Sequence, residues 1–97
     1  MKKEKILDLL TEIARQLKIK VRQEKGDFAG GYCLKEQEPF VLLNKRHMLD
    51  KRICILAREI SAFDLSGLTI PDPVMKVIES ERKRATQTEL ESTAEEE

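Results

Sequence analysis

Three residues of this chain have side chains soft enough to bind a transition metal: Cys33, His47 and Cys54. A zinc site with one open coordination position needs three such ligands. Structural zinc sites usually take two ligands from one tight turn, whereas these three are expected on a strand, in a loop and on a helix. We therefore predict no metal site and no bound cofactor, and we expect both cysteines to be free, packed thiols.

A thiol could instead act as a nucleophile or as a sensor. Cys54 lies four residues before Arg58, so the two share one side of a helix, and a nearby cation lowers the pKa of a thiol. The single histidine, His47, does not complete a catalytic triad by itself. A thiol-dependent enzyme or sensor that uses Cys33 and Cys54, assisted by Glu59, is therefore an alternative to a non-catalytic protein.

Lys45, Arg46 and His47 form a basic cluster, and further basic residues follow as far as Arg58. A patch of this kind attracts phosphates. Nucleic-acid-binding proteins normally combine a larger basic excess with exposed aromatic rings that stack on bases, and this chain has one Tyr and no Trp. Weak nucleic-acid binding through residues 45–58 is a second alternative, and nucleic acid is not the expected partner.

The chain has 97 residues, which is enough for one hydrophobic core and too few for two domains. Its net charge of zero conceals an asymmetry, because residues 86–97 contain five Glu and no basic residue. This end of the chain has almost no apolar residues, so it cannot offset the entropy cost of ordering. We predict a single domain at residues 1–84 and a disordered acidic tail at residues 85–97.

Neither a membrane span nor a signal peptide is expected. The longest uninterrupted apolar run, residues 40–43, is far shorter than the roughly 18 to 20 residues that span a bilayer. Residues 1–5 are basic, but Asp8 and Glu12 interrupt the segment that follows and no small-residue cleavage site appears. The sequence predicts a cytoplasmic protein that has no membrane partner.

The first half of the chain predicts a helix followed by three strands. Residues 3–18 place apolar side chains on one stripe at helical spacing, and residues 19–23 then alternate with period two. A short apolar segment at residues 32–34 follows two glycines, and residues 40–44 are β-prone and apolar nearly throughout, as in a strand that is covered on both faces. Three successive strands with short links predict a three-stranded antiparallel meander.

The second half of the chain is helical. Residues 49–63 carry an apolar stripe and predict the central helix of the fold, which ends near Ser66 and Gly67. A short C-terminal helix is expected from about residue 73 to 83. The predicted fold class is α+β.

The order of these elements, with the sequence Leu-Ala-Arg-Glu-Ile-Ser-Ala at residues 56–62, resembles the core of the ImmA/IrrE-like zinc metallopeptidases. In that family a strand ending in Asn leads into a helix whose consensus is similar to Leu-Ala-His-Glu-Leu-Gly-His. The resemblance covers residues 3–63 and implies a zincin-like core.

The two histidines of that motif lie one helical turn apart so that both reach one Zn²⁺, and the Glu between them polarises the bound water. The corresponding positions here are Arg58, a permanent cation, and Ala62, which has no donor atom. Only Glu59 matches the motif. The resemblance therefore implies a metal-free relative that keeps the scaffold and has no catalytic or metal-binding residues.

The leading functional hypothesis is a non-catalytic protein-interaction module whose partner is an unknown protein or a second copy of the chain. The observation behind it is the C-terminal helix, which carries more apolar side chains than a single packing stripe requires. The residues singled out as a candidate surface or cleft are Lys45, Arg46, His47, Arg58, Glu59, Cys33 and Cys54.

Overall fold

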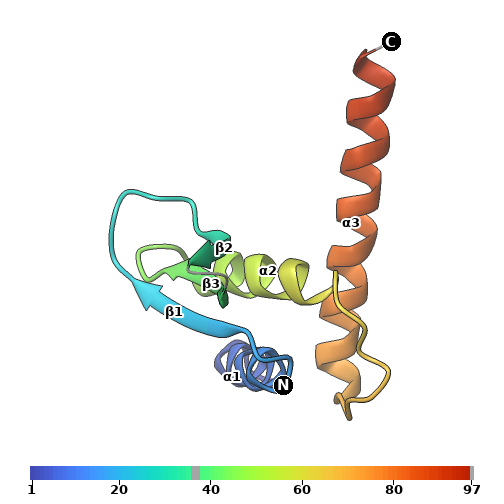
Figure 1. Cartoon of the computed structure of the whole chain (residues 1–97). Coiled ribbons are helices and arrows are strands. Elements are labelled where there is room, and N and C mark those ends of the chain that lie inside the picture. The colour runs from blue at the N-terminus through green and yellow to red at the C-terminus, as the bar shows by residue number, and fades with distance from the viewer. Residues whose placement is uncertain (36–37, 97) are drawn as a thin grey trace.

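The computed structural model describes residues 1–35 and 38–96, with the side chains of residues 1–31 and 40–85. In the described residues one helix is followed by three strands and then by two further helices (Figure 1). In chain order they are α1 (Lys3–Gln16), β1 (Lys20–Glu24), β2 (Gly31–Lys35), β3 (Glu38–Asn44), α2 (Leu49–Ile60) and α3 (Asp72–Glu96).

The junction between α1 and β1 is a tight C-terminal helix cap. Lys18 has φ 66°, the left-handed conformation in which a helix commonly ends. The Ile19 N–H donates to the Ala14 carbonyl at 2.8 Å and the Lys18 N–H donates to the Arg15 carbonyl at 3.0 Å, which is the Schellman pattern. Ile19 is only 2% exposed, so the cap also fixes the direction in which β1 leaves the helix.

The three strands form one sheet in the order β1-β3-β2. β2 pairs with β3 in an antiparallel hairpin, but β1 pairs with β3 in parallel, with Val21 opposite Val41. The predicted antiparallel meander is therefore wrong, because the chain crosses from one edge of the sheet to the other between β1 and β2. The centre of the sheet is β3, the most apolar strand, and this position agrees with its run of apolar residues.

The crossing loop, residues 25–30, is held at the C-terminal end of β3 by Asn44. The Asn44 side chain is 2% exposed and its amide donates to the carbonyls of Gly26 and Phe28 at 2.8 and 2.9 Å. Gly30 has φ 85°, and a Cβ at this position would lie 2.7 Å from the Leu42 carbonyl oxygen. These close contacts explain why the chain can pass over β3 instead of turning back beside β1.

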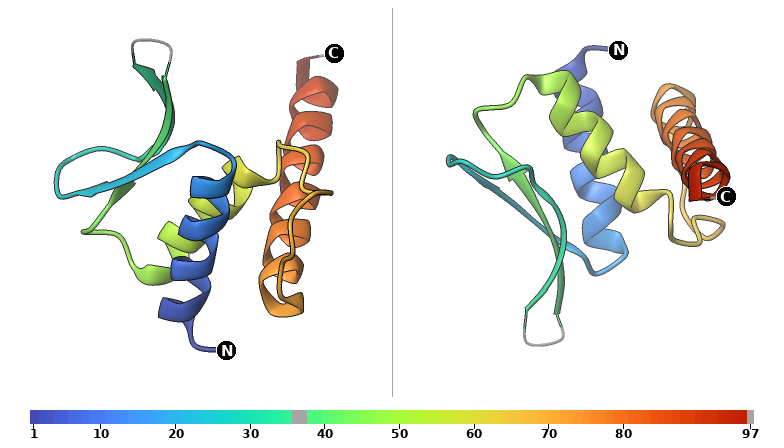
Figure 2. Two further views of the ribbon diagram at one scale, coloured as in Figure 1. Left: turned by 60° about the horizontal axis from the view of Figure 1, so that its bottom comes forward. Right: turned by 90° about the horizontal axis from the view of Figure 1, so that it is seen from above.

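The core lies between the sheet and the helices. α1 and α2 pack against each other and cover one face of the sheet, and α3 packs on the far side of these two helices (Figure 2). α2 contacts α1, α3, β2 and β3, so it is the central helix. The largest fully buried side chains are Leu10, Leu43, Leu56, Ile60, Ile78, Val41 and Val74.

The prediction of a short C-terminal helix is wrong, since α3 has 25 residues and continues to Glu96. Figure 1 shows its C-terminal half extending beyond the other elements. The residues after Arg84 are mostly Ala, Gln, Glu, Leu and Thr, and several of these favour helix even without an apolar stripe. Within the described part of the chain, no helix is both long and apolar enough to cross a membrane. The disordered tail at residues 85–97 stays a prediction.

Candidate functional site

A groove of about 760 Å³ lies between the last turns of α1 and the beginning of β1. The C-terminal cap of α1 places the two elements side by side, so a single stretch of chain supplies both walls. Thr11, Glu12 and Arg15 form the helix wall. The strand wall and the floor are formed by Lys18, Ile19, Lys20, Val21 and Arg22.

The groove opens onto a strand edge that has no neighbour among the described residues, because β1 is the end strand of the sheet. The Lys45 N–H donates to the Glu24 carbonyl at 2.9 Å, so the backbone of Glu24 faces β3. The N–H and C=O groups of one strand residue point to one edge, and those of the next residue point to the other. The backbone groups of Val21 and Gln23 therefore point away from β3, towards the open edge.

The groove is basic. Its lining includes four cations and one carboxylate, Glu12, which is paired with Arg15 through a hydrogen bond of 2.9 Å from Nε and a second contact from Nη2. This pairing lowers the pKa of Glu12. Arg22 makes an ion pair with Glu24 at 3.0 Å, on a part of the surface where both side chains are about half exposed. Exposed pairs of this kind exchange readily with other charged partners.

The predicted basic cluster is largely engaged within the fold. Arg46 makes an exposed ion pair with Asp27 at 3.2 Å, and its N–H donates to the Asn44 side chain. His47 is half-buried and its N–H donates to the Asn44 carbonyl at 3.0 Å. Lys45 is exposed and extends the parallel ladder through its backbone. These residues form the turn between β3 and α2, next to the crossing loop, and they do not line the groove.

Arg58 and Glu59 lie near the end of α2. Arg58 is exposed, whereas Glu59 is half-buried, and burial raises the pKa of its carboxyl group while Arg58 lowers it by less. α2 ends at Ile60, so Ala62 lies in the turn that follows. The position that would carry the second metal ligand of the zincin motif is thus outside the helix.

Cys54 faces α3. Burial raises the pKa of its thiol, and so do the charge of Glu81 and a hydrogen bond to that carboxylate. Glu81 is 5% exposed and lies 3.6 Å from Arg84, measured from Oε1 to Nη1. The sequence pointed to Arg58 as a cation that lowers this pKa, but the net shift is in the opposite direction. The thiol is therefore protonated and weakly nucleophilic at neutral pH.

Cys33 lies in β2 opposite Phe40, and its side chain is outside the described residues. Cys54 faces α3, whereas His47 lies in the turn between β3 and α2. Among the residues whose side chains are described, no group of three or more His, Cys, Asp or Glu is arranged to hold a metal ion.

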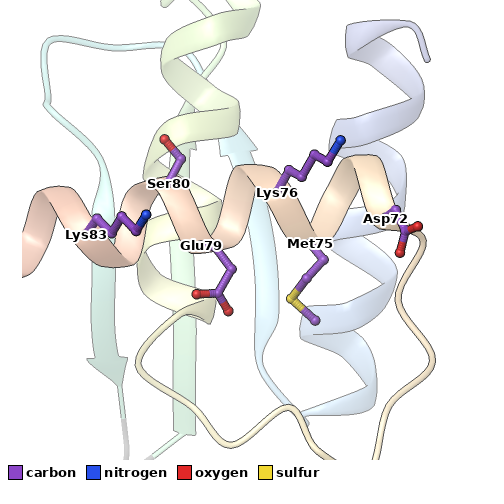
Figure 3. A pocket seen from close by; sticks show the side chains of 6 residues that line it. All are labelled: Asp72, Met75, Lys76, Glu79, Ser80 and Lys83. Carbon is purple, nitrogen blue, oxygen red and sulfur yellow. The ribbon is translucent and has the colours of Figure 1, made fainter.

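Two further hollows lie on α3. The first, of about 410 Å³, is lined by six side chains that all project from α3 itself, including Met75 and Lys76 (Figure 3). The second, of about 330 Å³, lies between α3 and the turn that contains Phe63. Val74 and Ile78 are fully buried, so much of the apolar surface that motivated a partner on this helix belongs to the core. Neither hollow brings together groups that could do chemistry.

The sequence alone did not indicate that the groove residues form a site. The alternation of Lys20, Val21 and Arg22 correctly marked a strand with one buried face. It did not mark an open edge, because the edge depends on which strands pair. The one available signal was the long apolar run of β3, which identified another strand as the centre of the sheet.

No family model, no curated protein and no solved structure matches this chain. Among the described residues that line the groove there is no thiol and no imidazole, and the Thr11 hydroxyl donates to the Leu7 carbonyl at 2.8 Å. The distinctive features of the groove are cations and backbone groups that face outwards.

Proposed function

We propose that this chain is a non-catalytic protein-interaction module that binds a partner along the open edge of β1. The observation that carries the proposal is that β1, among the residues the structure describes, is paired on one side only and borders a groove. A strand edge presents a row of N–H and C=O groups to which another chain can pair. The packing of α1 beside β1 holds this edge in place before a partner arrives, which reduces the entropy cost of binding.

The two alternative functions have less support. A thiol-dependent reaction at Cys54 requires a thiolate, and burial beside Glu81 raises the pKa of that thiol. Nucleic-acid binding through residues 45–58 requires cations that are available to phosphates. Half-buried Arg52 is engaged within the fold, since it donates to Gln23 at 3.0 Å, and the described residues of this segment line neither the groove nor the two hollows on α3.

The kinship with zincin peptidases stays part of the proposal and is not required by it. β3 ends at Asn44 and the chain then enters α2, which agrees with the order of elements in that family. Arg58 and Ala62 stand at the two ligand positions, which supports a relative without metal chemistry. In this proposal the buried side chain of Asn44 has a structural role, because it holds the crossing loop.

The experiment is site-specific photo-crosslinking in cells that produce the protein. A photoreactive amino acid replaces Lys18, an exposed residue of the groove, and in a second sample it replaces Lys76 on the outer surface of α3. We expect one discrete crosslinked protein from position 18 and none of the same mass from position 76. The same species should disappear when Val21→Pro is added, since proline removes an outward N–H without touching the β3 ladder.

Equal crosslinking from both positions would show that the contact is not specific to the groove. A species that survives Val21→Pro, in a variant whose thermal unfolding is otherwise normal, would show that the strand edge is not used. Either result contradicts the proposed function.

A further inference from the structure

The open edge of β1 can accept an added strand only in a defined frame. Its outward groups are the N–H and C=O of Val21 and Gln23, while the Ile19 N–H is already used in the cap of α1. An incoming chain therefore pairs with alternate residues of β1 and lies in the groove above Thr11 and Arg15. Main-chain pairing of this kind supplies affinity and leaves specificity to the side chains.

The two faces of β1 differ, and they set different requirements for the two faces of an added strand. Val21 and Gln23 are half-buried on the helix side, whereas Lys20, Arg22 and Glu24 are exposed on the opposite side. Side chains that lie opposite each other on neighbouring strands interact directly. On the helix side, the added strand would place apolar side chains beside Val21. On the opposite side, the side chains of its alternate residues would lie beside Lys20 and Arg22.

The net charge of the groove is positive. Arg15, Lys18, Lys20 and Arg22 all line the groove, against Glu12 within it and Glu24 next to it. Lys18 also occupies a left-handed backbone position that favours glycine. The groove therefore has a cation at a position where the backbone conformation alone would favour a residue without a side chain.

A second copy of this chain fits the edge less well than an acidic chain. A two-fold axis at Val21 would set Lys20 of each copy opposite Arg22 of the other. An axis at Arg22 would set the two Arg22 side chains opposite each other, although it pairs Lys20 with Glu24, and an axis at Gln23 would set Arg22 opposite Glu24. Like charges directly opposite each other across strands are destabilising. A carboxylate-bearing chain has the complementary charge and avoids this repulsion.

We infer that the groove binds an extended acidic segment of a partner protein, which adds to β1 as a further strand with apolar and acidic residues in alternation. This inference rests on the proposed function and names its ligand class. The outward backbone groups of Val21 and Gln23 pair with the segment, and the cations at positions 18, 20 and 22 face its carboxylates.

The test is fluorescence anisotropy with the full chain and a labelled peptide of alternating Glu and Val. We expect saturable binding that weakens as salt is raised. Lys18→Glu with Lys20→Glu should weaken it by about tenfold or more, whereas Lys76→Glu with Lys83→Glu, the same charge change on exposed residues of α3, should change it by less than about twofold. The same peptide with an N-methyl group at every residue should not bind, because neither of its edges can then donate hydrogen bonds to a strand.

Four results would overturn the inference. Binding of the N-methylated peptide would show charge attraction without strand pairing. Equal binding of a Lys-Val peptide would exclude an acidic ligand. Tighter binding of oligodeoxythymidine would identify a nucleic-acid surface, and dimerisation that Val21→Pro abolishes would identify a second copy as the occupant. The N-methylated peptide also keeps the test valid if Val21→Pro fails to fold.

The failure of this inference can be told from the failure of the proposed function. If the acidic peptide does not bind but crosslinking from position 18 persists and is lost with Val21→Pro, the binding edge stands and the ligand class is wrong. If crosslinking fails as well, both are wrong.

Discussion

The side-chain amide of Asn44 donates to the Gly26 carbonyl at 2.8 Å, which ties the end of the central strand to the loop that crosses it. The side-chain oxygen of Asn44, Oδ1, in turn accepts from the Arg46 N–H at 3.0 Å. One buried side-chain amide thus forms hydrogen bonds with backbone groups of the loop before β2 and of the turn after β3. Since this loop carries the chain from β1 to β2, Asn44 stabilises the strand order that leaves β1 at the edge.

Asn44→Asp should destabilise the protein by about 2 to 4 kcal/mol, because a carboxylate can accept from Arg46 but cannot donate to the Gly26 and Phe28 carbonyls. Urea unfolding measures the change. Asp8→Asn is the control, since it exchanges the same two residue types at an exposed site on α1 and should change stability by less than about 0.5 kcal/mol. A similar cost at both positions would show that Asn44 has no special structural role.

Lys18→Gly should stabilise the protein by about 0.5 to 1 kcal/mol. Glycine relieves the positive φ of 66° at this position, and the gain exceeds the entropy that glycine adds to the unfolded chain. The matched control is Gln16→Gly, two residues earlier in the last turn of α1, which should destabilise by up to about 1 kcal/mol. Thermal unfolding of the two variants should give shifts of opposite sign. If Lys18→Gly also lowers the melting temperature, the strain assigned to this cap is absent.

The positions of the elements could be predicted from the sequence because they depend on local periodicity. The stripe at residues 3–18 corresponds to α1, and the stripe at residues 49–63 corresponds to α2 with a shorter C-terminal end. Strand pairing could not be predicted in the same way, because it depends on contacts between distant residues. The Asn44 contacts with Gly26 and Phe28 span 18 and 16 residues, and no local sequence pattern indicates them.

The candidate site was predicted less well than the fold, for a different physical reason. Cys54 and His47 were chosen because their side chains can do chemistry, but the groove offers backbone groups and common cations. Whether Lys20 or Val21 lies at an open edge depends on strand order and cannot be inferred from residue type. The helical spacing of Cys54 and Arg58 was also insufficient, because α3 brings Glu81 to the thiol from a distant part of the sequence.

Deletion of residues 86–97 should leave the free energy of unfolding unchanged within about 0.5 kcal/mol. The buried contacts described for α3, those of Val74, Ile78 and Glu81, all lie before this segment. Deletion of residues 72–97 is the control, and it should unfold the protein because it removes two fully buried core side chains. In the full chain, amide exchange after residue 86 should be fast, as the prediction of a disordered acidic tail requires. Slow exchange there would contradict that prediction.

The last prediction concerns the ionisation of Cys54. Its pKa is raised in the folded protein by burial and next by Glu81, so the folded state holds the proton more tightly than the unfolded chain does. The resulting stabilisation is complete below the pKa of the unfolded thiol and is lost as pH rises through the folded pKa. The difference in stability between the wild type and Cys54→Ala should therefore be constant at neutral pH and should move in favour of the variant in alkaline solution.

The same charges should control the rate at which iodoacetamide alkylates Cys54, measured by mass spectrometry on the peptide that contains it. Glu81→Gln removes a negative charge beside the thiol and should raise the rate at pH 8 by about threefold to tenfold, because more thiolate is present. Arg84→Gln removes a cation that lowers the pKa, and it should slow the reaction. The two variants lie on one helix, so a general loosening of α3 would accelerate both. Opposite effects would show that local charge sets the reactivity of the thiol, and equal effects would refute this account of Cys54.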